Sequence, residues 1–407
     1  MKELRQVLVI NDHGYVNGGI SRVALESSRA LAERGLDVTF FSSVAGPQEE
    51  LDFSGLKMRT IHQPEFLADP NRARGLGRAF WNRGAEKAVG ALADSLDPEH
   101  SIVHVHSWAQ ANSASIFAPL LRKKVRLIVS LHDYFIACPN GAFTVFPRAA
   151  ICGVKPLSLA CLGKNCDSRS RLHKLFKFGR AWVQGRIARA PAGIRNFIFV
   201  SSFNQRMLHQ YLPPTAQTFL LPNPIDLPKG APSEVGNNSA WAFVGRLSRE
   251  KGARLFAEAA ARLKLESLFI GEGEEAGDIR KANPEARMLG WLERGPLLAT
   301  MTQARGIVFP SLCLESQPLV VHEALALGLP VIVSSETAAA ELVEHGETGL
   351  VFRKNDVEDL VLKIRQLEEN PELRSKMGRQ AFERYWSQPP TLEKHVDRLL
   401  EIYRAVE

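Results

Sequence analysis

Several features that would assign the 407-residue chain to other classes of protein are missing. No apolar run approaches the roughly 20 residues that a membrane-spanning helix requires. The first five residues lead directly into the apolar stretch 6–10, and they contain neither the long apolar region nor the cleavage site of a signal peptide. We therefore expect a cytoplasmic protein, either soluble or bound peripherally to the inner face of the membrane.

The chain also lacks the complete signature of a dinucleotide-binding site. The loop after the first apolar stretch contains Gly14, Gly18 and Gly19, but not the Gly-x-Gly-x-x-Gly spacing. The second expected strand is followed by Ser42-Ser43, where an acidic residue would bind the ribose of NAD. These absences argue against a dehydrogenase. The glycines either let the backbone approach a phosphate or sugar, or they simply form a tight loop.

The composition is that of a globular protein, with 45% hydrophobic and 23% charged residues and enough chain for two domains. Lys and Arg exceed Asp and Glu by 51 − 44 = 7, but residues 70–195 hold 20 basic and 6 acidic side chains, a local excess of 14. Such a basic half attracts an anionic membrane or an acidic glycan, or it is a solvated face that aids solubility. No nucleic-acid-binding motif occurs, so we expect no nucleic-acid partner.

Strand and helix patterns alternate along the chain. Apolar runs predict strands at 6–10, 36–41, 101–106, 125–131 and 197–201, and a stripe with a period of about 3.6 predicts a helix over 20–34 that Gly35 ends. A Pro-, Gly- and Asn-rich segment at 221–239 indicates a linker. A second alternating series starts at Trp241. This pattern predicts an α/β protein with two doubly wound parallel sheets.

We place the domain boundaries from these patterns. The first domain spans residues 1–224 and contains a cysteine-bearing insert at 138–166, and the second spans 225–382. The remaining segment is 383–407, and within it the apolar spacing of Val396, Leu399, Leu400 and Tyr403 predicts a terminal helix over 392–406.

The most informative stretch is residues 315–323, which holds two glutamates eight positions apart. The run 306–309 predicts a buried strand, and Pro318 suits the first position of a following helix. Gly328 fits the left-handed cap of that helix. Free backbone N–H groups near Leu319 would then lie at the carboxyl end of a strand, where an anion binds well. Of Glu315 and Glu323, one could reach a sugar hydroxyl while the other reaches a ribose, which outlines a site for a nucleotide sugar.

A second group of polar residues follows the strand that starts at Trp241. Gly245 ends this strand, and Arg246 and Lys251 come five positions apart in the loop. Two cations at this spacing can bind one diphosphate, although alone they would also fit a loop with solvated charges. No Asp-x-Asp sequence occurs, so we expect the cations to replace a metal ion and catalysis to need no cofactor.

In this order, the motifs resemble those of the retaining glycosyltransferases of family 4 (glycosyl transferases group 1). The resemblance covers most of the chain and is most specific over residues 240–352. It implies the GT-B fold, with two Rossmann-like domains that face each other across a cleft and a C-terminal helix that packs back on the first domain. The supporting segments are Gly18-Gly19, His132-Asp133, 243–252, Leu289-Gly290-Trp291, Phe309-Pro310-Ser311, 315–323 and 341–351.

The resemblance also implies roles for individual residues. Arg246 and Lys251 would neutralise the departing diphosphate, which is the main electrostatic task of the reaction. Glu315 would bind the hydroxyls of the donor sugar and Glu323 the ribose, and His132 would lie beside the reacting carbon. The remaining donor-binding positions that we expect are Gly18, Gly19, Gly245, Trp291, Ser316, Gln317 and Leu319.

The implied function is transfer of a sugar from a UDP- or GDP-sugar to a hydroxyl of a glycan or lipid-linked acceptor. Family membership implies retention of the anomeric configuration and a role in the synthesis of cell-surface polysaccharide or glycolipid. Two alternatives remain open. One is a GT-B nucleotide-sugar epimerase, which needs no acceptor, and the other is a protein that binds nucleotide sugars without turnover.

Four of the five cysteines, Cys138, Cys152, Cys161 and Cys166, lie within 29 residues of one another. The gaps of 13, 8 and 4 residues match no compact zinc motif. A structural zinc site, free thiols and disulfides therefore all remain open. The insert follows His132-Asp133, so we expect it to border the acceptor site.

Residues 170–189 form a basic amphipathic segment. Such a segment either lies on a membrane surface, close to a lipid-linked acceptor, or packs on its own domain with a solvated basic face. Its apolar face is predicted to contain Leu172, Leu175, Phe176, Val183 and Ile187.

Overall fold

The computed structural model describes residues 3–46 and 56–406. The chain divides into two compact units. Unit 1 contains Met1–Ala142, Val154–Pro224 and Pro390–Glu407, and unit 2 contains Phe143–Gly153 and Ile225–Pro389. One division falls between residues 224 and 225, as in the sequence-based boundary. In contrast, residues 143–153 group with unit 2, and the chain returns to unit 1 at Pro390 rather than at residue 383.

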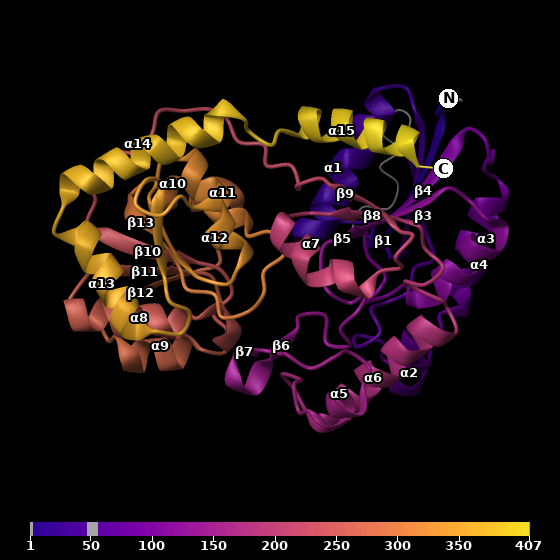
Figure 1. The fold of residues 1–407 in the computed structure, drawn as a ribbon, viewed down its shortest axis with the longest axis horizontal. Coiled ribbons are helices and arrows are strands. Elements are labelled where there is room, and N and C mark those ends of the chain that lie inside the picture. Colours follow the sequence, from indigo (N-terminus) through magenta and orange to yellow (C-terminus); the bar gives the residue numbers. More distant parts are fainter. Residues whose placement is uncertain (1–2, 47–55, 407) are drawn as a thin grey trace. The chain divides into compact units, whose positions relative to one another are not determined.

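Unit 1 is built on a seven-stranded parallel sheet with the strand order β3-β2-β1-β4-β5-β8-β9 (Figure 1). Its strands are β1 (Gln6–His13), β2 (Asp37–Val44), β3 (Leu56–Thr60), β4 (Ser101–Val105), β5 (Leu127–Leu131), β8 (Asn196–Phe199) and β9 (Gln217–Leu220). Its helices are α1 (Gly19–Glu33), α2 (Arg72–Phe80), α3 (Arg83–Asp94), α4 (Phe117–Lys123), α5 (Leu159–Gly163), α6 (Arg171–Arg186), α7 (Ser202–Leu208) and α15 (Leu392–Ala405).

Unit 2 is built on a six-stranded parallel sheet with the strand order β12-β11-β10-β13-β14-β15. Its strands are β10 (Ala240–Val244), β11 (Ser267–Ile270), β12 (Arg287–Gly290), β13 (Ala304–Phe309), β14 (Val331–Ser334) and β15 (Gly349–Phe352), and a hairpin of β6 (Thr144–Val145) and β7 (Ala150–Ile151) belongs to the same unit. Its helices are α8 (Ala253–Leu263), α9 (Ala276–Ala282), α10 (Arg294–Met301), α11 (Leu319–Ala326), α12 (Ala338–Leu342), α13 (Val357–Glu368) and α14 (Pro371–Ser387).

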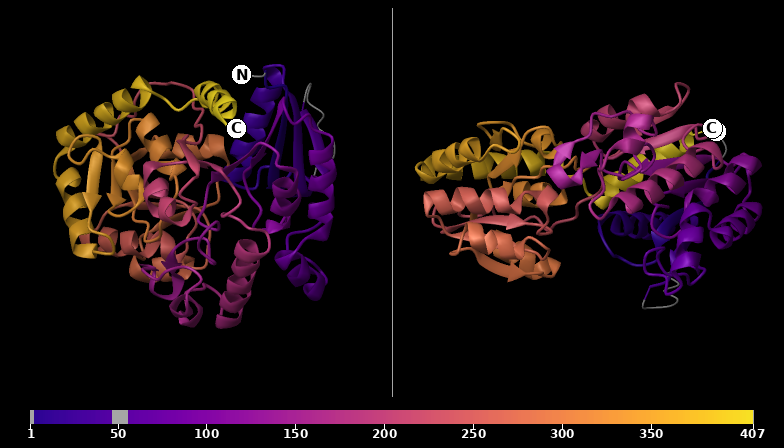
Figure 2. Two further views of the ribbon diagram at one scale, coloured as in Figure 1. Left: turned by 45° about the vertical axis from the view of Figure 1, so that its right-hand side comes forward. Right: turned by 90° about the horizontal axis from the view of Figure 1, so that it is seen from below.

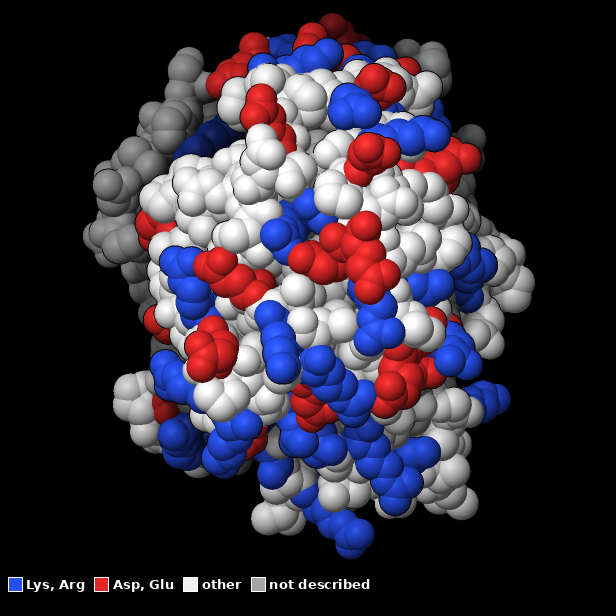
Figure 3. Space-filling view, turned by 90° about the vertical axis from the view of Figure 1, so that its left-hand side faces the viewer, with Lys and Arg blue, Asp and Glu red and all other residues white. Residues whose placement is uncertain are grey.

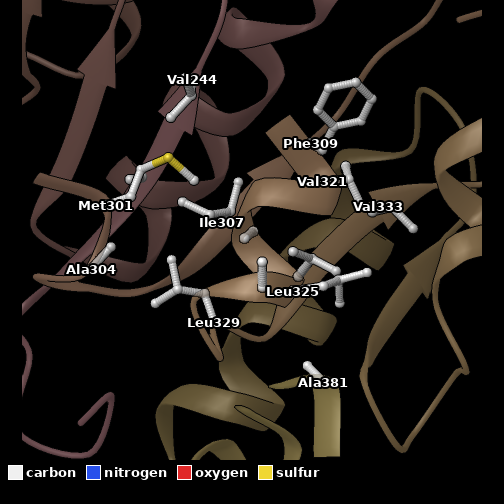
Figure 4. Close-up of a cluster of buried hydrophobic side chains, with 14 of the residues drawn as sticks. Val244, Met301, Ala304, Ile307, Phe309, Val321, Leu325, Leu329, Val333 and Ala381 are labelled. Carbon is white, nitrogen blue, oxygen red and sulfur yellow. The ribbon is translucent and has the colours of Figure 1, made fainter. Parts of the chain in front are cut away.

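Side chains of alternate residues in β10 enter two different hydrophobic clusters. Ala242 and Val244 pack on one face of the sheet, in the cluster that Figure 4 shows, and Trp241 and Phe243 pack on the other. Both faces of the sheet are therefore covered, as is typical of a parallel sheet flanked by helices. The sequence predicts this arrangement because residues 240–244 are apolar without interruption.

Helices α14 and α15 are separate elements (Figures 1 and 2). Helix α15 packs against α1 in unit 1, where Leu399 and Tyr403 are fully buried. The Tyr403 hydroxyl lies 2.7 Å from His104 Nδ1, and Arg126 donates to the carbonyl oxygens of Tyr403 and Val406. The terminal helix begins at Leu392, as the apolar spacing predicted, whereas the segment bound at residue 383 is wrong because residues up to Ser387 still belong to α14.

Both sheets contain a point at which the strand order reverses. In unit 1 it lies between β1 and β4, and in unit 2 it lies between β10 and β13. The loops that follow the two strands at such a point diverge to opposite sides of the sheet. This leaves a crevice at the carboxyl ends of the strands, which is where ligands of open α/β sheets bind.

Candidate functional site

In unit 2, the loops after β10 and β13 are joined through their backbones. The N–H groups of Leu312 and Cys313 donate to the carbonyl oxygen of Glu250 at 2.8 and 3.2 Å. Gly252 adopts the left-handed region at φ +72°, and a Cβ atom there would lie 2.2 Å from the carbonyl oxygen of Pro310. Only glycine allows this close approach. The contact fixes the basic loop against the end of the neighbouring strand.

Lys251 and Glu315 form an ion pair at this junction. Lys251 Nζ donates to Glu315 Oε1, and the Ser311 hydroxyl donates to the same oxygen at 3.1 Å. The Lys251 and Glu315 side chains retain 29% and 16% of their exposure, so solvent or a ligand can still reach them. Burial alone would raise the pKa of Glu315, but the Lys251 ammonium and the hydrogen bonds bring that pKa below its ordinary value. Both groups are therefore charged at neutral pH.

The thiol of Cys313 lies next to this pair but stays neutral. Its sulfur is 3.6 Å from Glu315 Oε1. Burial, and then the negative charge of Glu315, raise the pKa of the thiol to about 12. Since the thiolate is the nucleophilic form, Cys313 is not equipped for covalent catalysis.

Helix α11 starts one residue later than the sequence suggested. Pro318 is its N-cap, with ψ at 94°, so the first helical residue is Leu319 rather than Pro318. Among the described residues, no side chain caps this end of the helix. The Val321 N–H group donates to the carbonyl oxygen of Pro318 at 3.1 Å, and the binding of an anion to the N–H groups before it stays a prediction. Glu323 is half-buried one turn into the helix, and Gly328 takes the expected left-handed conformation at φ +73°.

The remaining predicted donor-binding residues of unit 2 lie at neighbouring strand ends. Gly245 follows β10, and Arg246 is exposed beside it. Trp291 is 71% exposed just after β12. The other three, Ser316, Gln317 and Leu319, are partly buried in the loop before α11 and at its first residue.

In unit 1, His132 follows β5 and stacks on His106. The ring centroids are 5.2 Å apart, and His132 Nε2 lies 3.0 Å from His106 Nδ1. Burial, and then the nearby His395, lower the pKa of His132 to about 3. His132 is therefore neutral at physiological pH and cannot supply a positive charge to a bound phosphate.

A cavity of about 190 Å³ lies at the strand-order reversal of unit 1. A Cβ atom at Gly18 would meet nothing within 4 Å, so packing does not demand glycine there and the mouth of the cavity stays open. Both predicted glycines line this cavity, whereas His132 does not. Its lining residues are Asn11, Asp12, His13, Asn17, Gly18, Gly19, Ile20, Ser21, Ser107, Ala109, Gln110, Asp133 and Phe135.

Sequence reasoning gave no role to three charged residues around this cavity, although it named Asp133 as part of the segment His132-Asp133. Asp12 is buried and accepts hydrogen bonds from the N–H groups of residues 110, 111 and 112, which hold the loop after β4. Burial raises the pKa of Asp133 to about 6. Arg180, from α6, donates to the carbonyl oxygen of Ala109 at 2.6 Å. The polar triplet 11–13 directly after an apolar strand was a usable signal for Asp12, but nothing in the sequence connects Arg180 to this loop.

The cysteine cluster does not form a metal site in the described part of the chain. No group of three His, Cys, Asp or Glu side chains there is arranged to hold a metal ion, and all five cysteines are free thiols. In place of a metal, the Lys174 ammonium lies 3.3 Å from Cys161 Sγ. The structure therefore gives no support to a zinc ion or a disulfide at Cys138, Cys152, Cys161 and Cys166.

Comparison with known protein families matches nearly the whole chain. Residues 17–229 match the model described as Glycosyltransferase Family 4, and residues 232–384 match Glycosyl transferases group 1. The chain belongs to the family 4 glycosyltransferases. The resemblance inferred from the motifs is thereby confirmed, and with it the GT-B fold and the assignment to the sugar transferases.

Individual relatives are distant or cover part of the chain. The sulfoquinovosyl transferase of Arabidopsis thaliana is 32% identical over 146 residues, which are 34% of this chain and only 28% of that protein. The glycogen synthase of Mycobacterium tuberculosis is 26% identical over 74% of this chain and 77% of its own length. The structure of Anabaena HepE in complex with UDP superposes with a TM-score of 0.67 at 16% identity, covering 99% of this chain and all of that one. At this identity, the superposition supports the fold alone.

Within residues 3–46 and 56–406, no helix has both the length and the apolar character needed to cross a bilayer.

Proposed function

We propose that the chain transfers a sugar from a nucleoside diphosphate sugar to a hydroxyl of a glycan or lipid-linked acceptor. The observation that carries this proposal is the Lys251–Glu315 pair beside the uncapped amino end of α11. A cation, a carboxylate and backbone N–H groups lie together at one strand-order reversal, and together they suit the diphosphate and the sugar of the donor. The diphosphate needs positive charge and N–H donors, and the sugar needs a hydrogen-bond acceptor.

In the proposed donor complex, the N–H groups at Ser316, Gln317 and Leu319 bind the diphosphate. Arg246 is free to turn toward it because its side chain is exposed. Glu323 binds the ribose and Trp291 the base, which suits the 71% exposure of a large aromatic ring at a strand end. The base is a uracil or a guanine.

Lys251 and Glu315 act together in this scheme. Before the donor binds, each neutralises the other, so neither charge is left unpaired in a partly buried place. When the diphosphate binds, the Lys251 ammonium interacts with it as well as with Glu315. Glu315 accepts hydrogen bonds from the sugar hydroxyls. Lys251 then stabilises the charge that develops on the leaving diphosphate, in a position fixed before the reaction.

Unit 1 supplies the acceptor side of the proposal. Gly18 and Gly19 keep their proposed role at the donor, and the polar groups that line the same cavity, including Asp133, suit sugar hydroxyls. His132 is uncharged and can exchange only neutral hydrogen bonds with a sugar. Retention of the anomeric configuration, and a role in polysaccharide or glycolipid synthesis, are part of the proposal and rest on family membership.

The test compares donor consumption with and without an acceptor. Purified protein is incubated with UDP- and GDP-sugars in EDTA, and released nucleoside diphosphate is measured with and without lipid-linked or glycan acceptors. Release that requires an acceptor, and persists in EDTA, is the expected result. Products from donor alone would favour the epimerase, and binding without any release would favour a protein that has affinity but no turnover.

A further inference from the structure

Large apolar side chains are exposed mainly in one region of unit 1. Of thirteen such side chains in the described residues, eight lie between residues 76 and 187. Helices α2 and α5 both contact α6, and the three lie together at the lower right in Figure 1. Exposed apolar side chains that gather on neighbouring elements mark a surface that binds something. The eight residues are Leu76, Leu157, Leu159, Leu162, Leu172, Leu175, Trp182 and Ile187.

Helix α6 presents its apolar side chains outward. Leu172, Leu175 and Trp182 are 79%, 48% and 50% exposed, and their spacing places them on one face of the helix. The opposite, buried face contains Lys174 and Gln184. This arrangement corrects the expectation that Leu172, Leu175 and Ile187 would pack on the domain if the helix did so. The helix does pack on unit 1, through the buried polar residues and through Phe176, whose ring lies edge-on to Phe80 at 5.3 Å between centroids.

The buried polar residues of α6 explain why the helix is oriented in this way. Gln184 accepts a hydrogen bond from Trp108 Nε1 at 2.9 Å and donates to the carbonyl oxygen of Phe135 at 3.0 Å. Lys174 donates to Cys161 Sγ. Since these buried groups have their partners, turning the helix to bury its leucines would leave them unsatisfied.

The same region has charge of one sign. Residues 153–189 contain nine Lys and Arg and one acidic residue, Asp167, which gives an excess of 9 − 1 = 8. Asp167 is already paired with Lys177 at 2.8 Å. Arg171 and Arg186 are exposed at the two ends of the α6 apolar face. By contrast, Asp and Glu lie among the Lys and Arg side chains on the face that Figure 3 shows.

We propose that α6, together with α2 and residues 157–162, forms a docking surface for an anionic lipid bilayer. We call this the α6 surface. Leucine and tryptophan side chains enter the boundary between headgroups and acyl chains, while arginines bind lipid phosphates. The single-sign charge around the apolar face favours this occupant over a protein with mixed charge. The α6 surface deepens the proposed function, because it would bring the enzyme to a lipid-linked acceptor.

The first experiment is flotation with lipid vesicles at low salt. We expect the full chain to float with phosphatidylglycerol vesicles and not with phosphatidylcholine vesicles. Binding should weaken as salt is raised from 0.01 M to 0.15 M, because the Debye length falls from about 30 to about 8 Å. Absence of binding to phosphatidylglycerol at low salt would overturn the proposal.

Two sets of variants locate the binding surface. The triple variant Leu172→Ser/Leu175→Ser/Trp182→Ser should bind vesicles at least about tenfold more weakly than wild type. The control is Leu362→Ser, which changes a leucine that is 55% exposed on α13 and should bind like wild type. Charge reversal by Arg171→Glu/Arg186→Glu should also weaken binding at least about tenfold, and Lys376→Glu/Arg379→Glu on α14 is its control. Equal binding by wild type and the triple variant would place the contact elsewhere and overturn the proposal.

Two further measurements keep the interpretation unambiguous. Thermal melting shows whether each variant folds, and nucleotide titration shows whether the donor site is intact. We expect both to be unchanged, because the altered side chains face solvent. One outcome would assign the surface to self-association instead. In that case the wild-type protein is an oligomer, the triple variant is a monomer, and neither wild type nor any variant binds vesicles. The surface would then be a contact between copies of this chain, and the proposal would fail. Failure of nucleotide binding with intact vesicle binding would contradict the proposed function and leave the α6 surface standing.

Discussion

Lys251 is the residue whose contacts define the unit 2 site most closely. Replacement by alanine, Lys251→Ala, should lower turnover by about 10²-fold or more, because it removes a fixed cation from the leaving diphosphate. It also leaves Glu315 without its ion-pair partner. Steady-state kinetics with saturating donor measure the effect. Arg249→Ala, an exposed cation in the same loop, is the control and should change turnover little. Wild-type turnover in Lys251→Ala would remove the residue from the reaction.

His395 makes the stability of the protein depend on pH. Its side chain is 7% exposed, and burial lowers its pKa to about 4, whereas in the unfolded chain the value is the ordinary 6.5. Between pH 6.5 and about 4 the unfolded chain therefore binds the extra proton, so stability is full above pH 6.5 and falls with decreasing pH. The slope is about 1.4 kcal/mol per pH unit for one such group.

Chemical denaturation at several pH values tests this dependence. His395→Gln should flatten the loss of unfolding free energy between pH 6.5 and 4, and His209→Gln, at an exposed position, should not. The lowered pKa values of His104, His106 and His132 act in the same direction, so some pH dependence will remain in the variant. An unchanged slope in His395→Gln would show that this histidine is protonated in the folded protein.

The motif order located Lys251 and Glu315 in the loops after two strands that prove to be adjacent and parallel. The sequence did not predict that the two side chains pair with each other, which the structure shows. Asp133 was named without a role, and Arg180 was missed, because the environment of both residues depends on burial and on α6, which is far away in the sequence. Pro318 was placed one position too far into α11, since a fixed φ suits the N-cap as well as the first helical residue.

At the scale of elements, the loop that carries Lys251 depends on Gly252. We expect Gly252→Ala to cost about 1–3 kcal/mol of stability and to lower turnover, because its Cβ would meet a backbone oxygen that cannot move without shifting β13. Thermal melting and kinetics measure the two effects. Gly277→Ala is a matched control, since its Cβ would meet nothing within 4 Å. Full activity in Gly252→Ala would mean that the two loops move independently.

Helix α15 contributes to the core of unit 1 through residues far from the sheet in sequence. Leu399 is fully buried, so Leu399→Ala should lower the unfolding free energy by about 2–5 kcal/mol. Leu400→Ala, at the next and only partly buried position, should cost clearly less. Denaturant titration compares the two variants. Equal losses would show that α15 does not pack on unit 1 through the Leu399 face.

The sequence predicted the positions of the helices and strands closely. It predicted less well where each element ends and which of its side chains are buried. Strand β1 continues to His13, beyond its apolar run, because Asn11 and His13 still pair with β2. Helix α6 was predicted to be amphipathic, but its buried face is set by Lys174 and Gln184. Hydrogen-bond partners from other elements decided this orientation, and a single helical pattern contains no information about them.

For the whole molecule, alternating patterns and a linker were sufficient to predict two parallel-sheet units, and the resemblance to the family 4 glycosyltransferases implied the GT-B fold. The hairpin at residues 143–153 was assigned to the first domain because of its place in the chain, but its contacts group it with unit 2. The end of α14 was likewise obscured, because polar helices that follow one another give no clear break before Pro389-Pro390.

The measurement that tests the donor site most directly is calorimetric titration with UDP-, GDP- and ADP-sugars, both in EDTA and with Mg²⁺. We predict that one class of nucleotide, uridine or guanosine, binds without metal. Glu323→Ala should bind about tenfold to a hundredfold more weakly, because it loses charge-assisted hydrogen bonds of about 1.5–3 kcal/mol to the ribose. Unchanged affinity in Glu323→Ala would contradict the ribose role. Absence of binding by wild type to all three classes would contradict the donor site itself.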